Sequence, residues 1–407
     1  MLKILINAYA CSPNMGSEPG MAWNWCVNLA NHCELHIITE GEFKEQIEAL
    51  LPTLPQGKKM HFYYNPVSED IRKMCWNQGD WRFYRHYKKW QKKTLEIAKE
   101  IVEKEKIDII HQLNMIGFRE PGYLWMIKDI PFVWGPVDAK ESFPIGYLNQ
   151  ATITTKIFIS LKNIITKFQL TYDKRIKSAV KKAKLIFSAS SNSLETFRKY
   201  YNKETILLNE TGCNIKENPL FNKIDKEFLD LLWVGKFDFR KQLNLAIESL
   251  AQTKNKKIRL NIIGSGNVES YKKLSEQLDI HEQCIFHGIK SHQEVQKIML
   301  KSDLLFFTSV AEGTPHVVLE AISNNLPILA INTCGQGDVI NQNIGIKIEL
   351  TNYEQSKIDF ARELNKLFID RNILFKMSKN CKQRQIEMSW EKKTEQMVNL
   401  FYEILIN

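Results

Sequence analysis

Short apolar runs alternate with longer amphipathic stretches along the whole chain. This alternation is typical of β-α-β units, because strands buried on both faces of a parallel sheet are apolar throughout. The sequence therefore predicts an α/β fold. Strands are expected within residues 2–10, 33–40, 60–65, 107–113, 131–136 and 183–190, and again within 230–237, 259–266, 284–289, 303–309, 326–332 and 345–350.

The two series of strands predict two doubly wound domains, and 407 residues exceed the ~100–200 usual for one domain. We expect an N-terminal Rossmann-like domain over residues 1–208 and a second one over 209–388. Residues 389–407 predict an amphipathic helix that packs back towards the first domain. Since ligands of open α/β sheets bind beyond the carboxyl ends of the strands, the loops that follow the strands are the candidate functional segments.

Composition limits the class of protein but does not select a function. The eight cysteines are scattered, without the spacing of a zinc site, and predict reduced thiols. No apolar run approaches the ~18 residues that cross a bilayer, so the expected location is the cytoplasm. A formal net charge of +10 suits nucleic acid, acidic lipid or nucleotide phosphates as partners.

The loop after the first strand carries small and acidic residues ahead of a predicted helix. Gly16 and Ser17 can bring backbone N–H groups and a helix N-terminus against an anion, and Glu18 follows directly. A plain Gly/Pro turn is the alternative interpretation.

A basic loop follows the first strand of the second series. Gly235 allows close approach, and Lys236 and Lys241 supply charge that can stabilise a departing diphosphate. The alternative is a solvated helix start. After the next strand, Gly264 and Gly266 can pass close to a nucleotide, or simply form a turn.

Residues 302–330 are the most informative stretch. A buried strand leads to Glu312, after which Thr314 can cap a helix and Pro315 suits its first turn. The free N–H groups of that helix can bind a phosphate. Glu320 lies on a partly apolar helix face, where sugar hydroxyls are a natural partner; an ordinary helical glutamate is the alternative.

Together these motifs resemble glycosyltransferase family 4, the retaining enzymes of GT-B fold that use nucleotide-sugar donors. The likeness is strongest over residues 230–345. It implies two Rossmann-like domains facing a central cleft. In the family's paired-glutamate motif, Glu312 would contact donor sugar hydroxyls and Glu320 the nucleotide ribose. The donor would also lie against the backbone of Gly313, Thr314, Pro315 and His316.

Lys236 and Lys241 match positions where that family usually has an Arg and a Lys that clamp the diphosphate. Lys236 keeps the charge of the commoner Arg but lacks its bidentate fork, and Gln242 stands where a Gly often follows. The resemblance implies catalysis without a metal or other cofactor, in which lysines and helix dipoles stabilise the leaving group.

In the first half, the segments GSEPG, FREPGYLW and PFVWGPV resemble a subgroup often found in surface polysaccharide and lipopolysaccharide assembly. The resemblance implies a saccharide or lipid-linked acceptor, with Glu18 and Arg119 on the acceptor side. Family members commonly carry a functional His after the corresponding strand, and His111 is the candidate here. A core histidine is the alternative.

Two segments mix basic with apolar or aromatic residues, namely residues 81–104 and 156–184. Such segments suit a helix on an anionic membrane surface, which would place the protein on the inner face of the cell membrane. In the alternative interpretation the aromatics face the core and the lysines face water.

Two other functions remain open. A nucleotide-sugar epimerase or a sugar phosphorylase would share the fold and the phosphate contacts. A nucleic-acid-binding protein would use the positive charge, but the sequence lacks RNP, KH, zinc-finger and basic-zipper signatures, so we expect no nucleic acid partner.

Overall fold

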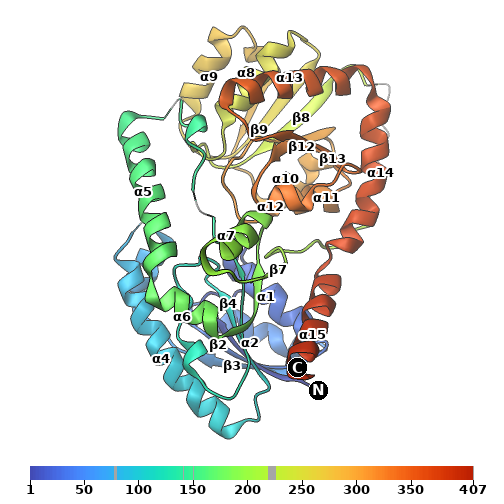
Figure 1. The fold of residues 1–407 in the computed structure, drawn as a ribbon. Coiled ribbons are helices and arrows are strands. Elements are labelled where there is room, and N and C mark those ends of the chain that lie inside the picture. The colour runs from blue at the N-terminus through green and yellow to red at the C-terminus, as the bar shows by residue number, and fades with distance from the viewer. Residues whose placement is uncertain (78–79, 141, 150, 219–225, 407) are drawn as a thin grey trace. The chain divides into compact units, whose positions relative to one another are not determined.

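The computed structural model describes residues 1–77, 80–140, 142–149, 151–218 and 226–406 (Figure 1). The chain divides into two compact units. Unit 1 comprises Met1–Glu141, Lys167–Glu210 and Trp390–Asn407, and unit 2 comprises Ser142–Thr166 and Thr211–Ser389.

Unit 1 is built on a seven-stranded sheet of order β3-β2-β1-β4-β5-β6-β7, whose neighbouring strands are all parallel. Its strands are β1 (Lys3–Ala8), β2 (Glu34–Thr39), β3 (Met60–Tyr64), β4 (Ile109–Asn114), β5 (Phe132–Val137), β6 (Ala183–Ser188) and β7 (Ile206–Leu207). Its helices are α1 (Ser17–Leu29), α2 (Lys44–Leu50), α3 (Glu69–Trp76), α4 (Phe83–Lys104), α6 (Lys174–Lys182), α7 (Ser191–Tyr201) and α15 (Trp390–Ile406).

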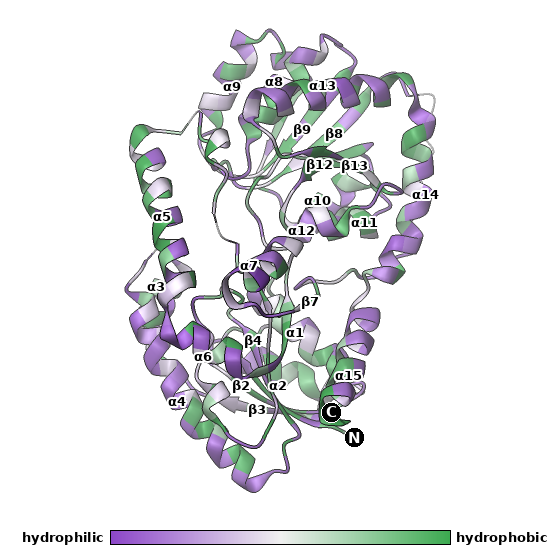
Figure 2. Cartoon of the chain, in the orientation of Figure 1, coloured by the Kyte–Doolittle hydropathy of each residue, from purple (hydrophilic) through white to green (hydrophobic). Residues whose placement is uncertain are grey.

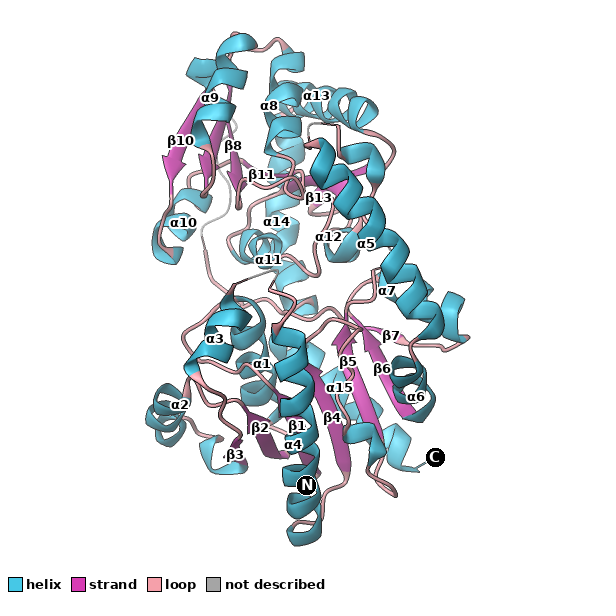
Figure 3. Cartoon of the chain, turned by 90° about the vertical axis from the view of Figure 1, so that its left-hand side faces the viewer, coloured by secondary structure: helices cyan, strands magenta, loops and turns pink. Residues whose placement is uncertain are grey.

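Side chains of β1 alternate between the two faces of this sheet, as the period of a strand requires. Ile4 and Ile6 pack in one core cluster with residues of α1 and α15, whereas Leu5 packs in the other with residues of α4 and α6. Helices thus cover both faces of the sheet (Figure 3). This arrangement explains why the strands are apolar throughout.

The terminal helix α15 belongs to unit 1. Its Trp390 ring meets that of Trp25 in α1 edge to face, with centroids 5.5 Å apart, and Met397 and Phe401 are fully buried. Burial of such a side chain stabilises the fold by roughly 1.5–3 kcal/mol, so α15 is integral to unit 1.

Unit 2 is built on a six-stranded parallel sheet of order β10-β9-β8-β11-β12-β13. Its strands are β8 (Leu229–Val234), β9 (Ile258–Ile263), β10 (Cys284–Gly288), β11 (Leu304–Phe307), β12 (Ile328–Asn332) and β13 (Gly345–Glu349). Its helices are α8 (Leu243–Thr253), α9 (Val268–Gln277), α10 (His292–Met299), α11 (His316–Ser323), α12 (Cys334–Val339), α13 (Tyr353–Ile369) and α14 (Arg371–Glu387).

The predicted α/β class and all the predicted strands are confirmed; the short strand β7 was missed. The unit boundaries differ from the predicted domains by one or two residues at 209–210 and at 389, and by one longer segment. Residues 142–166 were expected in the first domain but group with unit 2. The reason is Tyr147, which is buried in the core of unit 2, with its hydroxyl 2.6 Å from Ser356 Oγ. Helix α5 (Ile153–Tyr172) therefore continues from unit 2 into unit 1.

Most aromatic residues of α4 face the protein core. Phe83, Tyr87 and Trp90 are buried in a cluster around Tyr9, whose ring lies 4.9 Å from that of Trp90. The core interpretation is therefore correct for these three residues, and membrane contact through them is excluded. Trp81, just before the helix, is 79% exposed.

Within the described residues, no helix is both long enough and apolar enough to cross a membrane. All eight cysteines are free thiols, and only Cys75 is not fully buried.

Candidate active site

The sheet of unit 2 reverses its strand order beside β8. From β8 the chain continues outward through β9 to β10, and it then returns to place β11 on the other side of β8. The loops after β8 and β11 therefore lie next to each other at the carboxyl edge of the sheet. Such a switch point is where open α/β sheets bind ligands.

These two loops carry an ion pair. Lys241 Nζ lies 2.7 Å from Glu312 Oε1, and both side chains are nearly one-fifth exposed. Ser309 Oγ donates a hydrogen bond of 2.6 Å to the same carboxylate oxygen. The structure thus brings together two predicted site residues that are 71 positions apart in the sequence.

Hydrogen bonds to the backbone of the loop after β8 hold it next to the loop after β11. Val310 N donates to the Arg240 carbonyl oxygen at 2.9 Å, and Thr308 Oγ1 donates to the carbonyl oxygen of Lys241 at 2.8 Å. Because Thr308 and Val310 directly continue the buried strand β11, the position of Lys241 is fixed by the sheet itself.

Gln242 adopts a left-handed backbone conformation, with φ of 54°, immediately before α8. Glycine reaches this conformation without strain, which explains why a glycine suits the position. Here the Gln242 amide instead donates hydrogen bonds to the carbonyl oxygens of Phe239, at 2.6 Å, and Tyr147, at 2.7 Å. A glutamine at the position where a glycine was expected therefore still ties the loop after β8 in place, through these two hydrogen bonds.

Two further cations belong to this loop. Lys236 is exposed, and Arg240 pairs with Asp238, with Nη2 2.8 Å from Oδ2. The hydrogen bond that Arg240 donates to the Asp238 carboxylate raises the pKa of Arg240. The surroundings of the two lysines therefore differ: Lys241 is paired with Glu312 of the loop after β11, whereas Lys236 is exposed.

Gly264 and Gly266 follow β9 and pack against the loop after β8. Their φ angles are 154° and 147°, and a Cβ atom at either position would collide with residues 235–237. Phe237 N donates to the Ser265 carbonyl oxygen at 2.7 Å, so the two loops touch through their backbones. Their predicted contact with a donor remains a prediction.

Helix α11 begins at His316, one residue later than expected. Pro315, and not Thr314 as expected, occupies the N-cap position. Thr314 is instead buried beside Gly335, whose N–H donates to the Gly313 carbonyl oxygen at 3.0 Å. Burial lowers the pKa of His316, the first residue of the helix. The N-terminus of a helix such as α11 is the kind of place where proteins bind anions.

Glu320 finds side-chain partners from α10. Its carboxylate lies 3.3 Å from His292 Nε2 and accepts a hydrogen bond of 3.2 Å from Gln296 Nε2. These contacts explain how a carboxylate is accommodated on this helix face. Its side chain is still 31% exposed and can meet a hydroxyl group.

The sheet of unit 1 has its own switch point, between β1 and β4. The loops after these strands carry Gly16, Ser17 and Glu18 on one side and Arg119 on the other. Asn114 Nδ2 donates to the Ala10 carbonyl oxygen at 2.8 Å, and Glu18 accepts 2.7 Å from Ile116 N. The predicted residues of the first half therefore also gather at one sheet edge.

Within this group the side chains have distinct surroundings. Gly16 is the N-cap residue of α1, and Ser17 has a positive φ of 54°. Burial raises the pKa of Glu18, against the effect of its bond from Ile116. Arg119 Nε donates to Gln169 Oε1 at 2.7 Å, and burial lowers the pKa of Arg119.

His111 lies inside the sheet of unit 1. It is fully buried, its Nε2 lies 2.6 Å from the Gly135 carbonyl oxygen, and its ring meets that of Phe401. Burial lowers its pKa to about 4, so the ring is neutral at physiological pH. This placement favours the core-histidine interpretation.

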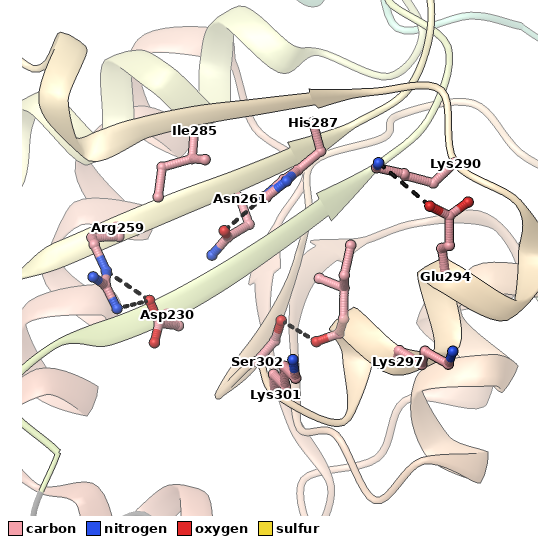
Figure 4. A pocket seen from close by; sticks show the side chains of 11 residues that line it. Asp230, Arg259, Asn261, Ile285, His287, Lys290, Glu294, Lys297, Lys301 and Ser302 are labelled. Carbon is pink, nitrogen blue, oxygen red and sulfur yellow. Dashed lines mark hydrogen bonds and ion pairs between the residues drawn. The ribbon is translucent and has the colours of Figure 1, made fainter.

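A cavity of about 530 Å³ lies elsewhere in unit 2, lined by residues of strands β8, β9 and β10 and of α10 (Figure 4). It is lined by charged groups such as the Asp230–Arg259 pair and by His287, whose Nε2 lies 2.9 Å from Asn261 Oδ1. Its lining consists of residues other than the predicted site residues.

Sequence reasoning missed several residues that support the site. Ser309 holds Glu312, while His292 and Gln296 hold Glu320. Gln336 is fully buried in α12 and donates 3.0 Å to the Ser309 carbonyl oxygen. Their polar side chains are ordinary in sequence, and only the packing of separate helices gives them a role.

The chain is similar to a glycosyltransferase family model and to named glycosyltransferases. Residues 214–387 match the family model described as Glycosyl transferases group 1. A lipopolysaccharide 1,6-galactosyltransferase of Salmonella typhimurium is 33% identical over 143 residues, which cover 33% of this chain and 38% of that protein. An uncharacterized 41.2 kDa protein in the cps region of Klebsiella pneumoniae is 25% identical over 135 residues, which cover 33% of this chain and 36% of that protein. The matched part thus spans about a third of these curated relatives.

Solved structures match over nearly the whole chain. The lipopolysaccharide outer core galactosyltransferase WaaB, in its apo form, has a TM-score of 0.67 at 16% identity and covers 99% of both chains. Anabaena Alr3699/HepE in complex with UDP has a TM-score of 0.63 at 14% identity, covering 99% of this chain and 100% of that chain. These likenesses show the fold, which is that of GT-B glycosyltransferases. Residues 214–387, which match the group 1 model, lie in unit 2.

Proposed function

We propose that this protein is a glycosyltransferase that transfers a sugar from a nucleotide-diphosphate donor to a saccharide or lipid-linked acceptor. The observation that carries the proposal is the Lys241–Glu312 pair at the switch point of unit 2, within the group 1 domain. The named activities of relatives in lipopolysaccharide synthesis, and the UDP bound in one structural neighbour, support the same proposal.

The proposed chemistry uses the two partners of the ion pair separately. The bond between the anomeric carbon and the diphosphate oxygen breaks, and Lys241 and Lys236 stabilise the charge left on the diphosphate. The acceptor hydroxyl oxygen bonds to the anomeric carbon, and its proton passes to the departing diphosphate. Glu312 orients the sugar through its hydroxyl groups, which raises the rate by positioning.

Lys241 and Glu312 contact each other in this structure, so each must leave the other to contact the diphosphate or the sugar. The strength of the ion pair permits this exchange. A partly exposed pair contributes on the order of 1 kcal/mol, whereas a hydrogen bond to a charged group contributes roughly 1.5–3 kcal/mol. A bound diphosphate can therefore displace Glu312 from Lys241 and free it for the sugar.

The finer assignment follows the resemblance to glycosyltransferase family 4. We propose retention of anomeric configuration, contact of Glu320 with the ribose, and no metal at the leaving group. Surface polysaccharide or lipopolysaccharide assembly is the proposed process, with Glu18 and Arg119 on the acceptor side.

We also propose that the enzyme works at an anionic membrane surface, through α5. Ile157, Phe158, Leu161, Ile164, Ile165 and Phe168 recur along one stripe of this helix, and each is more than half exposed. Hydrophobic positions are visible along α5 in Figure 2, interrupted by hydrophilic ones. The exposed lysines of the following helix α6, among them Lys177 and Lys181, suit acidic headgroups.

Thermal stabilisation by UDP-, GDP-, ADP- and CMP-sugars, without added metal, tests donor binding. A ligand that binds only the folded state raises the melting temperature. We expect one nucleotide class to stabilise the wild type, and Lys241→Ala to weaken its affinity by about 10- to 100-fold. Lys273→Ala, an exposed lysine of α9, is the matched control and should bind as the wild type does. Stabilisation by none of the donors would contradict the proposal.

A further inference from the structure

Three potential metal ligands converge on the β2–β3 edge of the sheet in unit 1. Glu34 and His36 are two positions apart on β2, so their side chains share one face of the sheet. His61 on β3 is the direct neighbour of His36 in the parallel register. The carboxylate of Glu34 and one nitrogen from each histidine all lie within 4.8 Å of one another.

The distances fit a small tetrahedral ion. Glu34 Oε1 lies 3.3 Å from His61 Nε2 and 3.7 Å from His36 Nε2. With metal–ligand bonds of about 2.0–2.2 Å, neighbouring ligand atoms around tetrahedral zinc are separated by about 3.3–3.6 Å. The two distances from Glu34 fit this spacing, and the two histidine nitrogens lie within 4.8 Å of each other.

His36 gives an independent indication of a ligand. The residue is 2% exposed, yet its buried Nε2 has no hydrogen-bond partner within the described structure. Its other nitrogen, Nδ1, lies 3.0 Å from the hydroxyl group of Tyr63. When Nδ1 carries the proton and donates to Tyr63, the lone pair of Nε2 points at Glu34 and His61. Histidine ligands of metals are oriented by such a bond to the other nitrogen.

The surrounding charges permit a divalent cation. Lys3 Nζ lies 3.4 Å from Glu34 Oε1, but it is nearer to Glu105, at 2.8 Å. Lys3 contributes one positive charge, and Glu34 and Glu105 contribute one negative charge each, so these three side chains sum to one net negative charge.

We propose that Glu34, His36 and His61 bind one Zn²⁺ ion, with water as the fourth ligand on the exposed side of His61. Two nitrogens and one carboxylate are a common zinc ligand set. The ion would fasten the edge strand β3 to β2. This site lies in unit 1 and is independent of the metal-free donor chemistry proposed for unit 2.

Zinc titration of the full-length protein tests the proposal. Tag-free protein, freed of metal with a chelator, is titrated with Zn²⁺ against a chromophoric chelator, and its melting temperature is followed in parallel. We expect one equivalent to bind and to raise the melting temperature. Co²⁺ in its place should give the intense visible absorption of tetrahedral coordination.

Variants locate the ion. His61 is 44% exposed, so His61→Ala should fold normally and lose at least about 100-fold in zinc affinity. Tyr63→Phe should lose about tenfold, because it removes the bond that orients His36. The control is His32→Ala, at an exposed histidine of unit 1 outside the cluster, which should bind as the wild type does. Unchanged binding in His61→Ala, or no stoichiometric binding by the wild type, would overturn the proposal.

Discussion

At the scale of single residues, partners define the site more than residue types do. Lys241 and Glu312 were identifiable from the sequence as separate charges at the ends of predicted strands. Their pairing at 2.7 Å depends on β8 and β11 being neighbours in the sheet, which no local pattern specifies. The partners of Glu320 come from α10, and were missed for the same reason.

Gln242 offers a test of how the basic loop is held. Gln242→Ala keeps a strained positive φ and loses two hydrogen bonds, so it should reduce the free energy of unfolding by roughly 1–3 kcal/mol. Gln242→Gly loses the same bonds but relieves about 1–2 kcal/mol of backbone strain, so it should be less destabilising. Chemical denaturation of both variants measures the order, and Ala being the milder change would contradict this account.

His111 gives a prediction for the dependence of stability on pH. Its folded pKa of about 4 lies below the usual 6.5, so the unfolded state takes up a proton first as the pH falls. The contribution to stability is present above pH 6.5 and is lost between pH 6.5 and 4, by about 3 kcal/mol. In His111→Gln this part of the pH dependence should disappear, as measured by urea unfolding at a series of pH values.

The same variant separates a core histidine from a catalytic one. Since His111 is enclosed by Gly135 and Phe401, we expect kcat of His111→Gln to stay within a fewfold of the wild type at pH 7.5. A fall of kcat by a factor of about 10² or more, in protein of normal stability, would restore the catalytic interpretation.

At the scale of elements, the hydrophobic pattern identified the strands, but it did not decide which side of a helix is buried or to which unit a segment belongs. The buried strands could be predicted because parallel strands are apolar on both faces. The alternation of basic and aromatic residues in α4 left two interpretations, and the packing around Tyr9 decided between them. The segment 142–166 was expected in the first half, whereas tertiary contacts such as those of Tyr147 and Phe143 group it with unit 2.

Helix α5 can be tested for membrane binding. Phe158→Glu combined with Ile165→Glu places two charges in its exposed apolar stripe, and should weaken binding to vesicles containing acidic lipid by about tenfold or more. Ile369→Glu, at an apolar residue of α13 that is 83% exposed, is the control. Co-sedimentation with acidic and neutral vesicles measures the effect. Equal binding by the double variant and the wild type would contradict a role of α5.

At the scale of the whole molecule, the sequence was sufficient for two α/β units because both strand series obey the same pattern. It also located candidate residues in loops at the carboxyl ends of strands, and the loops that carry Lys241 and Glu312 follow the two strands at the switch point of unit 2. It could not reveal the cluster of Glu34, His36 and His61, because strand pairing alone brings these residues together. Nor does the pattern specify the donor base, the sugar or the acceptor.

Transfer of the sugar to an acceptor distinguishes the proposed glycosyltransferase from an epimerase or a sugar phosphorylase. The most direct measurement follows radiolabelled sugar from the stabilising donor into an extract of bacterial envelope lipids and saccharides, without added metal. We predict label in the acceptor fraction, reduced about 10²- to 10³-fold in Glu312→Gln but unchanged in the control Glu282→Gln. Label recovered only as free sugar, epimer or sugar phosphate would contradict the claim.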